Sequence, residues 1–283
     1  MRASLEIWDI ALGQARVVLQ TDRLIEAPNW SPCGTYLLVN GEGELFRVPL
    51  ATPALARVEL GGLGKLNNDH GISRDGQTYV ISSHHGGKGA EMYLVPSSGG
   101  EPVRISRQAP SWWHSWSPDG KTLAYVAARH GSRVVDVYTM PASGGAERRL
   151  THGEGHHDGP DYGADGRHIY YNCDRDGHAQ IWVMGSDGVG QRKLFADDRV
   201  NWFPHPSPCG RHVVYLAYPP GTVGHPRDLP VSIWRMDPDG ENRRPLFDLF
   251  GGQGTMNVPN WAPDGHAFAF VRYEPAATAA PRP

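Results

Sequence analysis

One short phrase recurs six times along this chain of 283 residues and limits what the chain can fold into. In its fullest copy, residues 112–120, an aromatic segment leads into Ser-Pro-Asp-Gly, and an alternating apolar run follows at residues 121–126. Pro fixes φ at the second turn position and Gly accepts positive φ, so the phrase predicts a short strand that reverses into a longer one. The other copies lie at residues 29–34, 71–76, 161–166, 205–210 and 260–265.

The spacing of the phrase predicts the architecture. Successive copies are 42 to 55 residues apart, and a four-stranded propeller blade needs about 40–45 residues. Each repeat also has a second half, in which a strand such as residues 180–184 leads through a Gly-rich turn into a last short strand. We therefore expect an all-β fold, a six-bladed β-propeller of four-stranded antiparallel blades.

The two chain ends predict how the ring closes. The last copy is followed by one strand, residues 266–273, and then by a tail rich in Pro and Ala. Residues 5–9 match the pattern of residues 232–236, and residues 15–19 supply a further strand. Both ends would then build one blade, which removes the open sheet edge. This predicts a single propeller domain over residues 1–283, with residues 1–20 as outer strands of the closing blade and residues 275–283 as a flexible tail.

Composition and charge limit the partners and the compartment. A formal net charge of −3 without a basic run argues against a nucleic-acid partner. No stretch approaches the ~20 apolar residues of a membrane span, and the N-terminus does not resemble a signal peptide. The three cysteines, at positions 33, 173 and 209, are too scattered to pair. We expect a cytoplasmic protein, although a mature secreted chain without its leader would have the same features.

The histidines are distributed unevenly between the two faces of the expected propeller. Eleven of the fourteen fall in loops before an inner strand or between the second and third strands, which emerge on one face. The other three follow the repeated turn on the opposite face: His168, His212 and His266. The eleven are His70, His84, His85, His114, His130, His152, His156, His157, His178, His205 and His225. This asymmetry predicts a functional site at the His-rich mouth of the central channel.

Three of these histidines are candidate metal ligands. His70 and His114 occupy the same repeat position, and His205 lies one residue later in its repeat. Inner strands approach the axis there, so the three imidazoles could meet and hold a divalent metal such as zinc or manganese. The alternative is that each imidazole hydrogen-bonds to a neighbouring blade and holds the channel together. The candidates for a further donor are Gln253, or Asp158 and Asp161.

Three other side chains are candidates for catalysis. His85, in a Gly-rich loop, and His157 are candidate general bases. A solvated polar loop and a capped turn are the respective alternatives. Arg227 lies in the longest loop, stiffened by flanking prolines, and suits recognition of a carboxylate or phosphate. The alternative for Arg227 is an internal ion pair with Asp228.

The Ser-Pro-Asp-Gly phrases, the Ile-Trp-Val-Met strand and the Ser-Gly-Gly turns resemble the TolB-type, WD-repeat-like propeller family over essentially the whole chain. That resemblance implies the propeller fold and a rim that binds a protein or peptide. Residues 67–73, 202–208 and 251–259 are more elaborate than the repeat requires. The chain is also similar to the oligogalacturonate lyases, which hold a divalent metal in a propeller through several His and a Gln. That similarity implies His70, His114, His205 and Gln253 as ligands.

Two classes of function follow. The first is a metal-dependent carbohydrate-active enzyme, a lyase acting on an acidic or keto-sugar oligosaccharide. The metal and Arg227 would stabilise the enolate formed when His85 or His157 removes the adjacent proton. The second is a non-catalytic propeller that binds a protein or peptide partner. A lactonase-like hydrolase is a third possibility, but such propellers favour calcium and acidic ligands over a His-rich rim.

Overall fold

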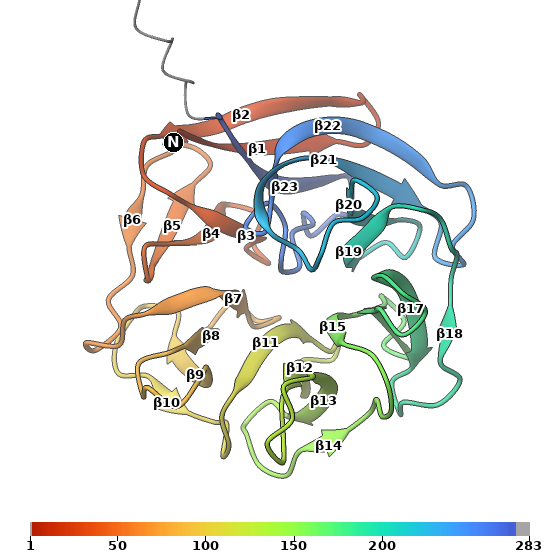
Figure 1. Cartoon of the computed structure of the whole chain (residues 1–283). Helices are drawn as coiled ribbons and strands as arrows, with labels where there is room; N and C mark the ends of the chain where they lie inside the picture. The colour runs from red at the N-terminus through yellow and green to blue at the C-terminus, as the bar shows by residue number, and fades with distance from the viewer. Residues whose placement is uncertain (1, 276–283) are drawn as a thin grey trace, which may run out of the picture.

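The computed structural model describes residues 2–275; the predicted tail falls almost entirely outside them, at residues 276–283. The described residues form 23 β-strands in six antiparallel sheets, arranged around a central axis (Figure 1). The predicted all-β, six-bladed propeller is confirmed. No helix capable of crossing a membrane occurs among the described residues.

Five blades contain four strands each, numbered from the axis outward. Blade 1 contains β3 (Glu26–Trp30), β4 (Tyr36–Gly41), β5 (Glu44–Pro49) and β6 (Ala56–Arg57). Blade 2 contains β7 (Leu66–Ile72), β8 (Thr78–Ser83), β9 (Glu91–Pro96) and β10 (Val103–Arg104). Blade 3 contains β11 (Ser111–Trp116), β12 (Thr122–Ala127), β13 (Asp136–Pro141) and β14 (Arg148–Arg149). Blade 4 contains β15 (His157–Tyr162), β16 (His168–Cys173), β17 (Gln180–Gly185) and β18 (Arg192–Lys193). Blade 5 contains β19 (Val200–Pro206), β20 (Val213–Tyr218), β21 (Arg227–Met236) and β22 (Arg244–Gly252).

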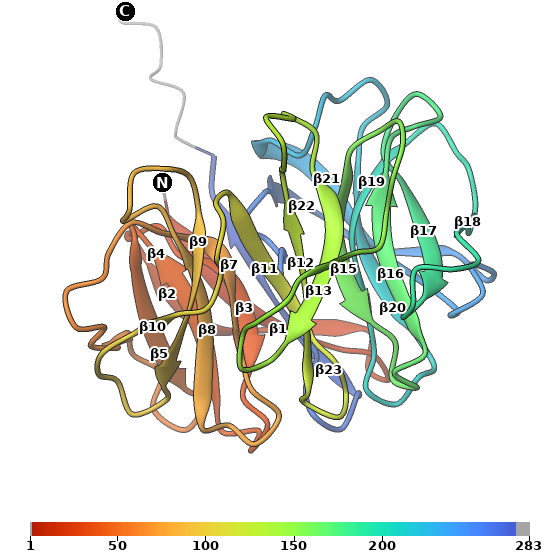
Figure 2. The same cartoon turned by 90° about the horizontal axis from the view of Figure 1, so that it is seen from below.

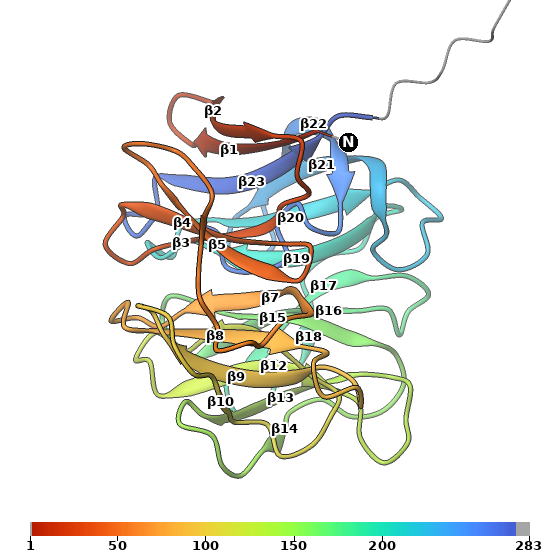
Figure 3. The ribbon, with the colours of Figure 1, turned by 90° about the vertical axis from the view of Figure 1, so that its left-hand side faces the viewer.

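Blade 6 is built from both chain ends, as the sequence predicts. Its sheet contains β23 (Ala267–Tyr273), β1 (Ala3–Asp9) and β2 (Gln14–Thr21), with β1 in the middle (Figure 3). A bridge between Trp261 and Phe268 takes the place of a full innermost strand. Arg272 Nε lies 3.0 Å from Glu6 Oε1, so an ion pair joins the two ends as well. The ring therefore has no unpaired seam between its first and last strands.

The repeated phrase forms the turn between the first and second strands of a blade. In blade 3, Gly120 has φ 71° and its N–H donates to the Ser117 carbonyl at 2.9 Å. The Ser117 hydroxyl donates to Asp119 at 2.6 Å and accepts from the Thr122 N–H at 2.9 Å. The Ser, Asp and Gly of the phrase thus supply a complete hydrogen-bonded turn, which explains why they recur together.

The inner strands of blades 1 to 5 are interrupted by β-bulges, where extra residues face one residue of the second strand. A bulge bends its strand and changes the direction of nearby side chains. In β11 the extra residue is His114, between the paired Trp113 and Ser115. His70 and His205 are instead paired within the ladder, just after the bulges of β7 and β19. Equivalent positions in the repeat therefore have different environments.

The blades pack face to face through apolar side chains. A close approach joins blades 2 and 3, where a Cβ on Gly71 would lie 1.9 Å from Cη2 of Trp113. Seen edge-on, the ring has its loops and turns gathered at two opposite faces (Figure 2). We call the face with the Ser-Pro-Asp-Gly turns the turn face. The opposite face, with the loops that precede the inner strands, is the loop face.

Candidate functional site

A recess of about 390 Å³ opens on the loop face, and we call it the cup. Blades 2 to 6 contribute its walls: Asn67, Asn68, Asp69, His84, Trp112, His114, Val126, Val135, His156, Asp158, Phe203, His225, Gln253 and Asn257. Four of the eleven histidines expected at this face meet there. The structure therefore brings four of the predicted histidines together at one mouth of the channel.

Asp158 organises the imidazoles of the cup. Its Oδ1 lies 3.2 Å from His114 Nε2, and its Oδ2 lies 3.2 Å from His156 Nε2 and 3.7 Å from His225 Nε2. The N–H of Gly159 also donates to Oδ1, at 2.7 Å. One carboxylate thus joins side chains of blade 3, blade 4 and the loop before β21.

The ionised form of Asp158 and the protonated forms of the neighbouring imidazoles stabilise each other. Burial alone would raise the pKa of Asp158, but the neighbouring imidazoles of His114, His156 and His225 hold it well below its usual range. Burial likewise opposes protonation of His114 and His156, yet the nearby Asp158 carboxylate leaves the pKa of both imidazoles raised. The cup therefore contains an ionised carboxylate beside two imidazoles, those of His114 and His156, that bind protons readily.

A second carboxyl group, Asp69, lies in the same recess and is only 7% exposed. Burial raises its pKa to about 6, against the opposing effect of His114. Asn67 holds it in place, because its Nδ2 donates to Asp69 Oδ2 at 2.5 Å. The elaborate segment at residues 67–73 marked this region in the sequence, but Asp69 itself was missed because its burial depends on the neighbouring blades.

Two side-chain amides in the cup form no hydrogen bond within the described residues, and we call them the free amides. Asn68, 6% exposed, and Gln253 line the recess without a side-chain hydrogen-bond partner among the described residues. Each amide offers one acceptor and two donor positions. Beside them, the His225 ring packs edge-on against Trp202 and Phe203, with centroid distances of 4.5 and 5.1 Å. The cup thus combines unsatisfied amides with a fixed aromatic wall.

Two of the four predicted metal ligands, His114 and Gln253, line the cup, and His70 and His205 do not. His70 is fully buried, with Nδ1 2.9 Å from Asn29 Oδ1 and Nε2 3.2 Å from Asn40 Oδ1. Burial lowers its pKa to about 3. Its hydrogen bonds join blade 2 to blade 1, which is the alternative role considered for it.

His205 has a similar role between blades 4, 5 and 6. Its Nε2 donates to the Met256 carbonyl at 2.8 Å, and its Nδ1 lies 2.9 Å from Asp161 Oδ2. No three His, Cys, Asp or Glu side chains within residues 2–275 are arranged to hold a metal ion. The predicted ligands therefore do not share one centre in this geometry, and metal binding stays a prediction.

None of the three predicted catalytic side chains lines the cup: His85, His157 and Arg227. His85 is exposed in its loop. His157 is fully buried, with Nδ1 3.1 Å from Asp136 Oδ1 of blade 3. Arg227 lies 3.5 Å from Glu26 and 3.6 Å from Asp228, so the internal pair considered for it is present, together with a second carboxylate.

Comparison with known proteins identifies the family. Residues 108–227 match the model of the TolB beta propeller domain. A solved structure from Agrobacterium tumefaciens, provisionally named TolB, is 51% identical with a TM-score of 0.95, and the match covers 98% of this chain and 99% of that one. The chain belongs to the TolB-type β-propeller family. Within the family, the uncharacterized protein Atu1656 of Agrobacterium fabrum is 52% identical over 277 residues, which are 97% of this chain and 94% of that protein.

Two more distant structures share the fold. TolB from Acinetobacter baumannii is 19% identical with a TM-score of 0.68, over 89% of this chain and 64% of that chain. An oligogalacturonate lyase in complex with manganese is 15% identical with a TM-score of 0.57, over 94% and 77% of the two chains. The predicted resemblance to both groups is confirmed at the level of the fold.

Proposed function

We propose that the chain is a non-catalytic propeller whose cup binds an extended segment of a protein partner. The observation that supports this most strongly is the pair of free amides, Asn68 and Gln253, in a recess at the end of the channel. A peptide backbone presents alternating N–H and C=O groups, and a side-chain amide pairs with both. The similarity to a structure named TolB supports the same class of function.

The rest of the cup suits such a ligand. Asp158 fixes His114 and His156 before any ligand arrives, so little side-chain freedom is lost on binding. Trp112, which is only partly buried, lines the same recess and offers an aromatic surface on which peptide side chains pack in binding sites.

Selection from a random peptide library tests the proposal. Wild-type protein is the bait, and enriched peptides are then titrated calorimetrically against Asn68→Ala, Gln253→Ala and the control Gln77→Ala, an exposed turn-face residue. The two cup variants should fold normally, because their side-chain amides have no protein partner among the described residues. We expect each substitution to weaken binding roughly 5- to 10-fold, which corresponds to the loss of one hydrogen bond. A library that yields no specific peptide, or peptides whose affinity the cup variants do not change, would refute the proposal.

A second candidate is a metal-dependent lyase acting on an acidic or keto-sugar oligosaccharide, with manganese or zinc as the cofactor. Its support is the shared location of His114 and Gln253, together with the common fold of the manganese-bound lyase. Its test is the metal content of untagged protein after loading, followed by the absorbance of unsaturated uronate products. Stoichiometric metal that is lost in His114→Ala, with product formed, would favour this candidate over the first.

A further inference from the structure

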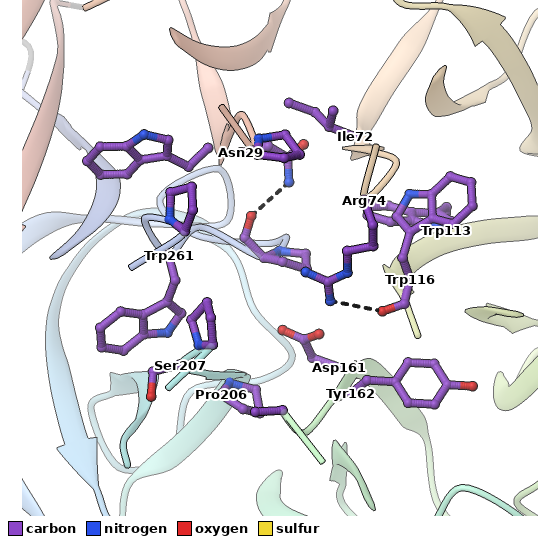
Figure 4. A pocket seen from close by; sticks show the side chains of 16 residues that line it. Asn29, Ile72, Arg74, Trp113, Trp116, Asp161, Tyr162, Pro206, Ser207 and Trp261 are labelled. Atoms are coloured by element: carbon purple, nitrogen blue, oxygen red, sulfur yellow. Dashed lines mark hydrogen bonds between the residues drawn. The ribbon is translucent and has the colours of Figure 1, made fainter. Parts of the chain in front are cut away.

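The turn face has a pocket of its own, at the opposite end of the channel from the cup. It measures about 200 Å³ and receives residues from all six blades (Figure 4). Most of them belong to the repeated phrase, so the wall is a ring of aromatic and proline side chains, among them Trp30, Trp116, Tyr162, Trp261 and Pro263. We call it the turn-face pocket.

One residue of this ring breaks the repeat. The second position of the turn is Pro in four copies and Ala in one, but in blade 2 it is Arg74. Figure 4 shows its guanidinium in the middle of the pocket, with a hydrogen bond of 3.3 Å to the Trp116 carbonyl. Its other hydrogen bond, to the Ser117 carbonyl, is 3.5 Å long. Arg74 has no ion-pair partner among residues 2–275, so its charge lacks a direct counterion.

The carboxyl group in the pocket does not neutralise Arg74, because it is already paired. His205 Nε2 must carry a hydrogen, since the Met256 carbonyl that it contacts can only accept. Its Nδ1 therefore either accepts a hydrogen bond from the protonated carboxyl group of Asp161 or, when it carries a hydrogen itself, donates one to the Asp161 carboxylate, 2.9 Å away. Both forms of the pair have zero net charge. The pocket lining as a whole then carries a single positive charge, that of Arg74.

We infer that the turn-face pocket binds a small organic anion, a carboxylate on an apolar or aromatic body. The carboxylate would pair with the planar guanidinium of Arg74, and the body would lie among the Trp and Pro side chains. A free carboxylic acid and the C-terminus of a peptide share this chemistry. The site is separate from the cup, so the inference does not depend on the proposed function.

Calorimetric titration with matched pairs of ligands tests the inference. The probes are 3-phenylpropanoate against 3-phenylpropanol, and N-acetyl-Ala-Phe with a free C-terminus against the same peptide as an amide. The variants are Arg74→Gln and Arg74→Pro, the second of which installs the residue that four other turns contain. The control variant is Arg133→Gln, an exposed loop-face arginine. We expect the acids to bind wild type and control, and to bind both Arg74 variants about 10- to 100-fold more weakly.

Three results would overturn the inference. They are equal affinity for acid and alcohol, unchanged affinity in both Arg74 variants, and absence of saturable binding of either acid at about 10 mM. Tighter binding of phenylpropanoate than of the peptide acid would assign the site to a small molecule, and the reverse order would assign it to a peptide C-terminus. Asn68→Ala should leave the binding of acids to the turn-face pocket unchanged. The inference about this pocket can therefore be tested independently of the proposed peptide binding in the cup.

Discussion

The buried pair of His157 and Asp136 joins blade 4 to blade 3 and makes a specific prediction about stability and pH. His157 is fully buried, and its Nδ1 lies 3.1 Å from Asp136 Oδ1. Burial alone would lower the pKa of His157, but the Asp136 carboxylate beside it, aided by Cys173, raises it to about 9. We therefore expect an imidazolium–carboxylate pair that stabilises the contact between the two blades at neutral pH.

The sign and size of the effect follow from the two states of His157. An unfolded histidine has a pKa of about 6.5, so below that pH both states are protonated and the stabilisation is fully present. It is lost as the pH rises through the folded pKa of about 9. The difference between the two pKa values corresponds to roughly 3 kcal/mol at most. In wild type, Thr151 Oγ1 donates to Asp136 Oδ1 at 2.9 Å. Asp136→Asn removes the negative charge but keeps an oxygen that can accept this hydrogen bond. The substitution also breaks the ion pair of Asp136 Oδ2 with Arg149 Nη2 at 2.5 Å, a loss that stays the same between pH 6 and 9.5. In addition, the variant should lose most of the His157 stabilisation at pH 6 and progressively less of it towards pH 9.5.

Urea unfolding of wild type and Asp136→Asn at pH 6, 7.5 and 9.5, followed by tryptophan fluorescence, measures this difference. The matched control is Asp165→Asn, because Asp165 contacts His168 at 2.8 Å in a pair with 33% and 52% exposed side chains. Exposed pairs contribute about 0–1 kcal/mol, so the control should show little loss at any pH. An Asp136→Asn loss of the same size at all three pH values would refute the ionic pair and leave His157 neutral.

Three further predictions concern packing, closure and metal. Gly71→Ala should lower the free energy of unfolding by about 2 kcal/mol or more, because its Cβ would lie 1.9 Å from Trp113 Cη2. A urea midpoint that hardly changes would contradict the tight contact. Leu5→Ala in β1 should lower the free energy of unfolding by about 2–5 kcal/mol, because Leu5 is fully buried in the closing blade. The control Val17→Ala, on the exposed side of β2, should lower it far less in the same urea assay. If the chain is a non-catalytic propeller, elemental analysis after manganese or zinc loading should find no stoichiometric metal in wild type. A bound equivalent that His114→Ala removes would instead support the metal-dependent lyase.

The fold could be predicted because its determinants are local and repeated. The Ser-Pro-Asp-Gly turn is complete within a few residues, as at Gly120, and its period sets the size of a blade. The closing blade was equally readable, because residues 5–9 share the pattern of another third strand. Neither inference needed knowledge of which side chains meet in space.

The site could be predicted only in its location. His70 and His114 share a repeat position, yet one is paired in its ladder and the other is the extra residue of a bulge. The repeat pattern does not show where a bulge falls, so the environments of the two imidazoles could not be distinguished. Asp158 was considered only as a spare ligand, because its partner His225 lies in another blade's loop. Contacts of this kind depend on the assembled ring.

The central claim is that the free amides of the cup bind a peptide. The most direct measurement is the calorimetric affinity of a library-selected peptide for wild type, Asn68→Ala and Arg74→Gln, determined both with and without a metal chelator. We predict tight binding to wild type and Arg74→Gln, and binding roughly 5- to 10-fold weaker to Asn68→Ala. Affinity that vanishes with the chelator, or that Asn68→Ala leaves unchanged, would contradict the account.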